Sequence, residues 1–320
     1  MALTINTNLS SMIVQQNLAK STTSLNQAIE RMTTGYKINH ASDNAAGYSI
    51  ARNWEAQLGS LDIAADNAAT GADMLSTLED NYALISSHVQ RVRDLTEQAA
   101  NGTYGEQSKK AIQSEITARL EEINRIAANC EFNGIDLMKG GSTAQATNGL
   151  DIQVGIDGTA SKSAIHLDKK LFAAGDIKSL FIVNNESGYT NYAFANNSTA
   201  AQAIEQLSKD CAGLNDERDA NGDLLEGKRS ASGMLTYLDR VINEISSRVT
   251  TLGAAQNRID SAIESIGVQS ENITSSLSTL RDADVATESS NYIKAQILQQ
   301  ASATLLATAN QTPSIALNLL

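Results

Sequence analysis

The chain has 320 residues, with one proline and 4% aromatic residues, so it lacks the commonest helix breaker and has little material for a thick globular core. This composition favours long, thin helical bundles. The formal net charge of −12 argues against a nucleic-acid-binding surface, which needs clustered Lys and Arg.

The first predicted helix lies at the N-terminus, where residues 1–19 carry no charged side chain. An apolar stripe runs through it and continues beyond Lys20 with a repeat near 3.5 residues, the signature of a coiled coil. We expect Gly35 to end this helix in a left-handed conformation, and Ser42 or Asp43 to cap the next. The stripe residues are Ile5, Leu9, Met12, Leu18, Leu25, Ile29 and Met32.

The clearest periodic signal runs from Ile50 to Val92 in one alternating three–four register. As an unbroken helix it would span about 60 Å at ~1.5 Å per residue. It should end near Asn101-Gly102, a turn signal. A third helix follows, which the sequence Phe132-Asn133-Gly134 should stop. Its inward positions are Ile112, Ile116, Leu120, Ile123, Ala127 and Cys130, so we expect Cys130 to be a buried free thiol.

The pattern then changes to period two. Apolar residues alternate from Leu150 to Ile156, Asp157-Gly158 offers a hairpin turn, and Ile165 and Leu167 fit a returning strand. Between about 180 and 230 we predict a small inserted domain or a decorated loop, with a short helix at 200–207.

A second very long helix is predicted from Leu235 to Leu280, in the same register as the first. Asp282 and Asp284 suit the start of a final helix, because carboxylates accept the free N–H groups there. After Lys294 no charged side chain follows. The apolar stripe of this last segment comprises Ile293, Ile297, Leu298, Leu305 and Leu306.

Two charge-poor amphipathic ends are natural partners for each other. Such helices are poorly suited to a solvated surface, yet they are too polar to lie in lipid. We therefore expect them to be buried among copies of the chain; the alternative is that each docks on its own globular domain. We also expect no membrane insertion, because no apolar run could span a bilayer. The N-terminus lacks the features of a cleavable signal peptide, so any export would use another route.

The predicted fold is mainly α. It is a long antiparallel coiled-coil-like helical bundle with a small β-hairpin region and a short inserted variable domain, and its N- and C-terminal helices are paired. We predict three domains: a terminal coiled coil (1–41 and 285–320), a helical bundle with a hairpin (42–179 and 231–284) and a small surface insert (180–230).

Nothing in the sequence predicts catalysis, a bound metal or a cofactor. No HExxH helix, phosphate loop or nucleophile elbow occurs, and His40, His88 and His166 stand alone. The acidic stretch from Glu217 resembles a calcium loop, but its twelfth position is Lys228, so we expect no calcium site.

Several separate motifs, in the right order, resemble those of the bacterial flagellins. They are Ile5–Asn8, Gly35–Ala51, Gln90–Leu95, Phe132–Gly134, Leu252–Arg258, Lys294–Ala301 and Ala309–Pro313. The resemblance covers about 1–180 and 234–320 and leaves the middle unmatched. It implies a secreted, extracellular subunit that self-assembles into the flagellar filament for motility, with the terminal helices lining an inner tube and the longer bundle forming an outer one.

The resemblance also implies partners. Flagellins pass unfolded through a flagellar type III export apparatus with an export chaperone, and they meet filament cap and hook-junction proteins. Some are ligands of an innate immune Toll-like receptor. The receptor-binding positions carried over from the family are Gln90, Arg91, Arg93, Leu95 and Glu115.

Arg91 and Leu95 are four residues apart and so share a helix face, which suits a binding ridge. A solvated face or a subunit-packing face is the alternative. A non-polymerising protein, either a hook–filament junction adaptor or an adhesin or receptor ligand, remains a second hypothesis for the whole chain. An enzyme would need a catalytic constellation in 180–230, where none is visible.

Overall fold

The computed structural model describes residues 8–140, 148–159, 163–181, 199–214 and 230–318, with residues 312–318 described by their backbone alone. The chain forms two compact units, residues 1–60 with 268–320 and residues 61–267. Each unit is helical, and two small antiparallel hairpins lie in the second. The mainly α fold predicted from the sequence is confirmed, whereas the three-domain division stays a prediction.

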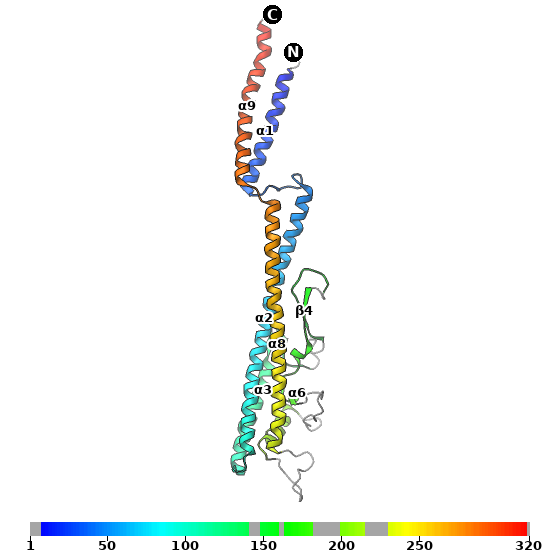
Figure 1. Ribbon diagram of the computed structural model, residues 1–320, viewed down its shortest axis with the longest axis vertical. Coiled ribbons are helices and arrows are strands. Elements are labelled where there is room, and N and C mark those ends of the chain that lie inside the picture. The colour runs from blue at the N-terminus through cyan, green and yellow to red at the C-terminus, as the bar shows by residue number, and fades with distance from the viewer. Residues whose placement is uncertain (1–7, 141–147, 160–162, 182–198, 215–229, 319–320) are drawn as a thin grey trace. The chain divides into compact units, whose positions relative to one another are not determined.

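In the first unit the two terminal helices α1 (Leu9–Thr34) and α9 (Val285–Asn318) pack side by side (Figure 1). The side chain of Asn8 caps α1 by accepting the N–H of Ser11, and Gly35 ends the helix with a φ of 75°. A left-handed residue at this position is why glycine is needed there. The predicted end of the first helix and the predicted pairing of the termini are confirmed.

The caps of the next helices differ in part from the prediction. The long helix α2 (Ala45–Ala100) is capped by Asn44, whose side chain accepts the N–H of Gly47 at 3.0 Å. Neither Ser42 nor Asp43 caps it, because the helix begins later and the Asp43 carboxylate instead accepts the N–H groups of Asn39 and His40. These hydrogen bonds, led by that from His40, lower the pKa of Asp43.

At the other connector, Asp284 caps α9 by accepting the N–H of Ala286 at 3.0 Å, as predicted. Asp282 lies outside both flanking helices and forms an isolated antiparallel bridge with Tyr36. The neighbouring Arg281 stacks its guanidinium 3.9 Å from the centre of the Tyr36 ring and pairs with the carboxylate of Glu55. The two connectors of the first unit are therefore joined by backbone and side-chain contacts.

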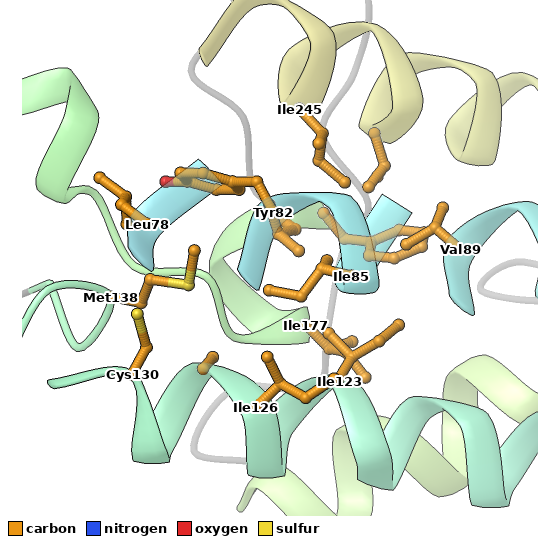
Figure 2. Close-up of a cluster of buried hydrophobic side chains, with 14 of the residues drawn as sticks. Leu78, Tyr82, Ile85, Val89, Ile123, Ile126, Cys130, Met138, Ile177 and Ile245 are labelled. Carbon is orange, nitrogen blue, oxygen red and sulfur yellow. The ribbon is translucent and has the colours of Figure 1, made fainter. Parts of the chain in front are cut away.

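The second unit is built around α2, α3 (Glu106–Asn129) and α8 (Ala231–Arg281). Both very long helices are unbroken, as the periodicity predicted. Figure 2 shows Tyr82 and Ile85 of α2 in one cluster with Ile123 of α3 and Ile245 of α8, while Leu78 lies nearer Met138. Cys130 and Cys211 are buried free thiols, which confirms the prediction for Cys130.

The period-two segment forms strands β3 (Leu150–Gln153) and β4 (Ala164–Leu167), paired antiparallel with Leu150 opposite Leu167 and Ile152 opposite Ile165. This hairpin is confirmed. A second hairpin, β1 (Glu131–Phe132) with β2 (Ile135–Asp136), was predicted only as a helix stop. Its turn residues Asn133 and Gly134 both have positive φ, the geometry that Asn-Gly favours in two-residue hairpins.

The described residues of the second unit also form three short helices: η1 (Lys169–Phe172), α6 (Ile177–Phe181) and α7 (Ala200–Cys211). Helix α7 begins with a capping box between Thr199 and Gln202, and it packs on α3. Its Leu207 and Cys211 are buried in the common core. The predicted short helix at 200–207 is confirmed and extends further; the calcium-like stretch Glu217–Lys228 lies outside the described residues.

Arg248 is a buried cation of the second unit, 8% exposed. Its Nη1 donates to the carbonyl oxygen of Ala174 at 3.1 Å and lies 3.5 Å from the hydroxyl of Tyr82, while its Nε donates to Glu244. The Tyr82 hydroxyl in turn donates to the carbonyl oxygen of Leu171. One side chain therefore joins α8, α2 and the segment that follows η1.

Candidate self-assembly surface

The paired terminal helices expose most of their large apolar side chains. Residues that the sequence predicted as a polymerisation core are 39–63% exposed in the structure. They are Leu9, Met12, Ile29, Met32, Ile293, Ile297, Leu298 and Leu305, joined by Ile13. Leu18, Leu25 and Leu306 are half-buried, and Ile5 lies outside the described residues. So many exposed large apolar side chains on two paired helices make this pair a candidate interaction site.

The fully buried residues of the seam between α1 and α9, among the side chains that the structure describes, are small or polar. Ala28 of α1 and Ala295, Ser302 and Glu288 of α9 are the buried residues of the two helices. Small side chains let two helices approach closely but remove little apolar area from water, and the stabilisation follows that area. The seam therefore pairs the two helices but leaves most of their larger apolar side chains exposed and only Leu18, Leu25 and Leu306 of the predicted set half-buried.

A ladder of hydrogen bonds fixes the register of this pair. The Asn8 amide donates to the carbonyl oxygen of Ala309 at 2.8 Å, and the Ser11 hydroxyl donates to the Asn310 side chain at 2.8 Å. Farther along, Gln299 donates to the hydroxyl of Thr22 at 3.3 Å. Near the connectors, Arg31 pairs with Glu288 at 3.2 Å. These bonds orient the apolar side chains outward.

Comparison with known proteins decides the family. The profile for the bacterial flagellin N-terminal helical region matches residues 5–143, and that for the C-terminal helical region matches residues 235–320. The chain belongs to the bacterial flagellin family. Members of this family are structural subunits of the flagellar filament, which lies outside the cell, and they are not enzymes.

Individual flagellins are similar over their whole length. A flagellin of Xenorhabdus nematophila is 37% identical and one of Serratia marcescens is 36% identical, each alignment covering all of both chains. A polar flagellin F of Vibrio parahaemolyticus is 31% identical with the same full coverage. Helix α7 lies between the two profile matches, in the part that the motifs also left unmatched.

The receptor-binding residues carried over from other flagellins do not form one exposed ridge. Arg91 is exposed and pairs with Glu115 of α3 at 2.9 Å, and Gln90 beside it is exposed. Arg93 pairs with Asp239 of α8 at 2.6 Å. Leu95, however, is 2% exposed and belongs to the core.

The expectation that Arg91 and Leu95 share a binding face is therefore wrong for the folded chain. A four-residue spacing brings two side chains near each other on a helix. A helix that packs against neighbours on both sides, however, has only a narrow solvent-exposed strip. Arg91 lies on that solvent-exposed strip. Leu95 lies beside the strip in the buried part of the helix, next to Thr96, which is fully buried.

The described part of the chain offers little for catalysis or metal binding. No group of three or more His, Cys, Asp or Glu side chains among those residues is placed to hold a metal ion. Across the same residues, no helix is both long and apolar enough to cross a membrane. Burial raises the pKa of Cys130 to about 11 and that of Cys211 to about 12, so both thiols stay protonated at neutral pH.

Proposed function

We propose that this chain is exported from the cell and polymerises through α1 and α9 into the helical flagellar filament that drives motility. The observation that carries this proposal is the exposed apolar surface on a nearly uncharged helix pair. Fully burying a large apolar side chain is worth about 1.5–3 kcal/mol, and covering one that is 39–63% exposed releases roughly half of that. Several such residues on each copy supply a substantial driving force for association.

The distribution of these residues favours a polymer over a closed dimer. At about 100° per residue, Leu9 and Ile29 lie roughly 160° apart around α1. One flat partner cannot cover both sides of a helix, so each copy needs more than one neighbour. Different patches that meet in a head-to-tail manner build open helical assemblies when the rotation does not close.

Truncation tests this proposal directly. Deleting residues 297–320 removes Ile297, Leu298, Leu305 and Leu306 and should leave a soluble, helical monomer that fails to extend filament seeds. Electron microscopy after seeding, with the full-length chain on the same seeds, gives the measurement. Normal filament yield from the truncated chain would reject the proposal. Persistent monomers from the full-length chain would favour a non-polymerising adaptor or adhesin.

We further propose that the flagellar type III export apparatus and an export chaperone handle this chain, and that it meets cap and hook-junction proteins at the filament ends. An apolar surface exposed on α9 inside the cell is an aggregation hazard, which a chaperone could prevent by covering it. Export in cells that lack a functional type III apparatus should cease. Continued appearance of the protein in the medium of such cells would contradict this route.

A second proposed role is binding to a Toll-like receptor through Gln90, Arg91, Arg93 and Glu115. The supporting observation is that Arg91 of α2 and Glu115 of α3 form a solvent-exposed ion pair, with their side chains 48% and 37% exposed. Arg91→Ala should weaken receptor binding, whereas Arg125→Ala, which breaks an exposed ion pair with Glu122, should not. Equal binding by both variants would remove the role.

A further inference from the structure

A polar cleft of about 420 Å³ lies between α1 and α9, within the first unit. Lys20, Gln27 and Arg31 line it from α1, and Glu288, Asn291 and Lys294 line it from α9. It therefore contains three cationic side chains and one carboxylate.

The charges of this cleft are not balanced within the chain. Glu288 is already paired with Arg31 at 3.2 Å. In the part of the chain that the structure describes, neither Lys20 nor Lys294 has a hydrogen-bond or ion-pair partner, and both are exposed. Lys20 is the only charged residue among residues 1–29, and Lys294 is the last charged residue of the chain. The two cations thus stand in one cleft on an otherwise almost uncharged helix pair.

A second observation comes from Arg31. Its Nε is buried and has no hydrogen-bond partner, although Nη1 of the same guanidinium contacts Glu288. A buried donor without an acceptor costs free energy. The Arg31 side chain lines the cleft, so the cleft contains a guanidinium with an unpaired donor in addition to the two lysines.

We propose that this cleft receives a carboxylate from a second copy of the chain, as an ionic contact of the assembled filament. The proposal rests on the polymerisation proposed above and names the chemistry of one of its contacts. The apolar side chain of Leu298 also lines the cleft and is 47% exposed. A neighbouring copy would cover that surface and deliver the anion together, whereas a free small anion would leave Leu298 in water.

Charge complementarity supports a second copy as the partner. The chain carries 36 acidic and 24 basic residues, so its surface supplies carboxylates in excess. Asp62, Asp66, Asp73 and Asp80 follow one another along α2 at steps of four and seven, and all are exposed. Among the described residues none of the four carboxylates has an ion-pair or hydrogen-bond partner. A row of this kind offers acceptors to cations on another copy.

Cross-linking tests the contact without any substitution. Filaments grown from equal parts of ¹⁴N- and ¹⁵N-labelled chain are treated with a water-soluble carbodiimide. The reagent activates a carboxylate; a lysine amine that touches it then forms an amide, and the reagent leaves as its urea. We expect mixed-isotope cross-linked peptides that contain Lys20 or Lys294. Cross-links of these lysines that are found only within one isotope, or none at all in well-formed filaments, would overturn the proposal.

Matched variants give an independent measurement. Removing both charges with Lys20→Gln and Lys294→Gln should raise the critical concentration for seeded growth about tenfold at low salt, and less at high salt, where exposed charges are screened. Lys20→Arg with Lys294→Arg should grow as the wild type does. The control, Lys169→Gln with Lys170→Gln, removes two exposed charges in the second unit. Circular dichroism checks that every variant is folded.

The outcomes separate the two proposals. Wild-type growth on seeds together with unchanged growth of the Gln pair removes the cleft contact alone. Failure of the wild-type chain to grow removes both proposals. Protection of both lysines from acetylation in the isolated monomer by millimolar inorganic phosphate, with no protection in phosphate-free filaments, would assign the cleft to a free anion and overturn its role between copies.

Discussion

Both units contain apolar residues at the same three–four spacing, but these residues are buried in the second unit and largely exposed in the first. In the second unit the stripe of α2 is covered by α3 and α8, and Leu75, Leu78 and Tyr82 are fully buried. In the first unit most of the predicted stripe residues of α1 and α9 are 39–63% exposed, and Ala28 and Ala295 are among the few buried residues of the pair. The apolar stripe of the second unit is therefore buried within one chain, whereas that of the first stays largely exposed and, on the proposal above, is covered by other copies.

Alanine substitutions of one core leucine and one surface leucine should show the difference between the two units most strongly. Leu78→Ala leaves a cavity in the second unit, which should lower its free energy of unfolding by about 2–5 kcal/mol. Leu305→Ala removes a side chain that is 57% exposed, so monomer stability should change by less than about 0.5 kcal/mol, while seeded growth should be severely reduced. Denaturant unfolding and seeded growth measure the two effects. A fully competent Leu305→Ala chain would contradict the assignment of the surface.

The buried cation of the second unit should give the next largest effect. Arg248→Met leaves the carbonyl oxygens of Ala173 and Ala174 without their donor, and a buried group left unpaired costs about 1–3 kcal/mol. We expect a loss of this size in the free energy of unfolding. Arg248→Lys should recover part of it, because one ammonium can reach only some of the acceptors. No loss in the Met variant would show that the contacts of Arg248 add nothing to stability.

Alanine substitutions at two glycines of α2 should change the free energy of unfolding by smaller amounts and in opposite directions. A Cβ at Gly71 would lie 2.5 Å from Cδ1 of Ile152 in β3, so Gly71→Ala should push the hairpin away and cost about 1–2 kcal/mol. Gly59 lies in the same helix with nothing within 4 Å of such a Cβ. Gly59→Ala should therefore stabilise the chain by about 0.5–1 kcal/mol, the gain in helix propensity. If both substitutions changed the free energy of unfolding in the same direction, the close contact with Ile152 would be excluded.

Alkaline pH should weaken the second unit through Cys211. Burial raises the pKa of this thiol from 9.0 to about 12. Because the unfolded chain loses the proton first, stability is intact below pH 9 and falls as the pH rises toward 12. At pH 10 the free energy of unfolding should be about 1.4 kcal/mol lower than at pH 8 from this group. The same pH series on Cys211→Ala should lack this part of the loss; identical slopes would refute it.

These features differ in how far the sequence alone could predict them. The long helix α2 and the two strands of the β3–β4 hairpin followed from periodicity, because each period is typical of one kind of element, whereas the register of the two strands came from the structure. The hairpin at Asn133-Gly134 could have been predicted from its Asn-Gly turn. The burial of Leu95 could not, since periodicity does not reveal where the edge of a packed face lies.

The assembly surface shows the same limit. Its residues and their need for a partner were predicted from the stripes of the terminal segments, but not which of them face the paired helix and which face outward. The seam uses Ala28 and Ala295, and only a structure shows that these small residues face each other while Ile297 and Leu305 point away. A helix with apolar residues on more than one side is compatible with several pairings, and the hydrogen bonds from Asn8 and Ser11 select one of them.

Hydrogen exchange in the free chain and in the filament tests the central claim most directly. In a dilute monomer, amides of residues 9–34 and 285–311 should exchange quickly, because their narrow seam permits local opening, while those of residues 74–99 should be protected. In the filament both sets should be protected. Terminal amides that are already as protected in the monomer as those of residues 74–99 would contradict the view that other copies complete the first unit.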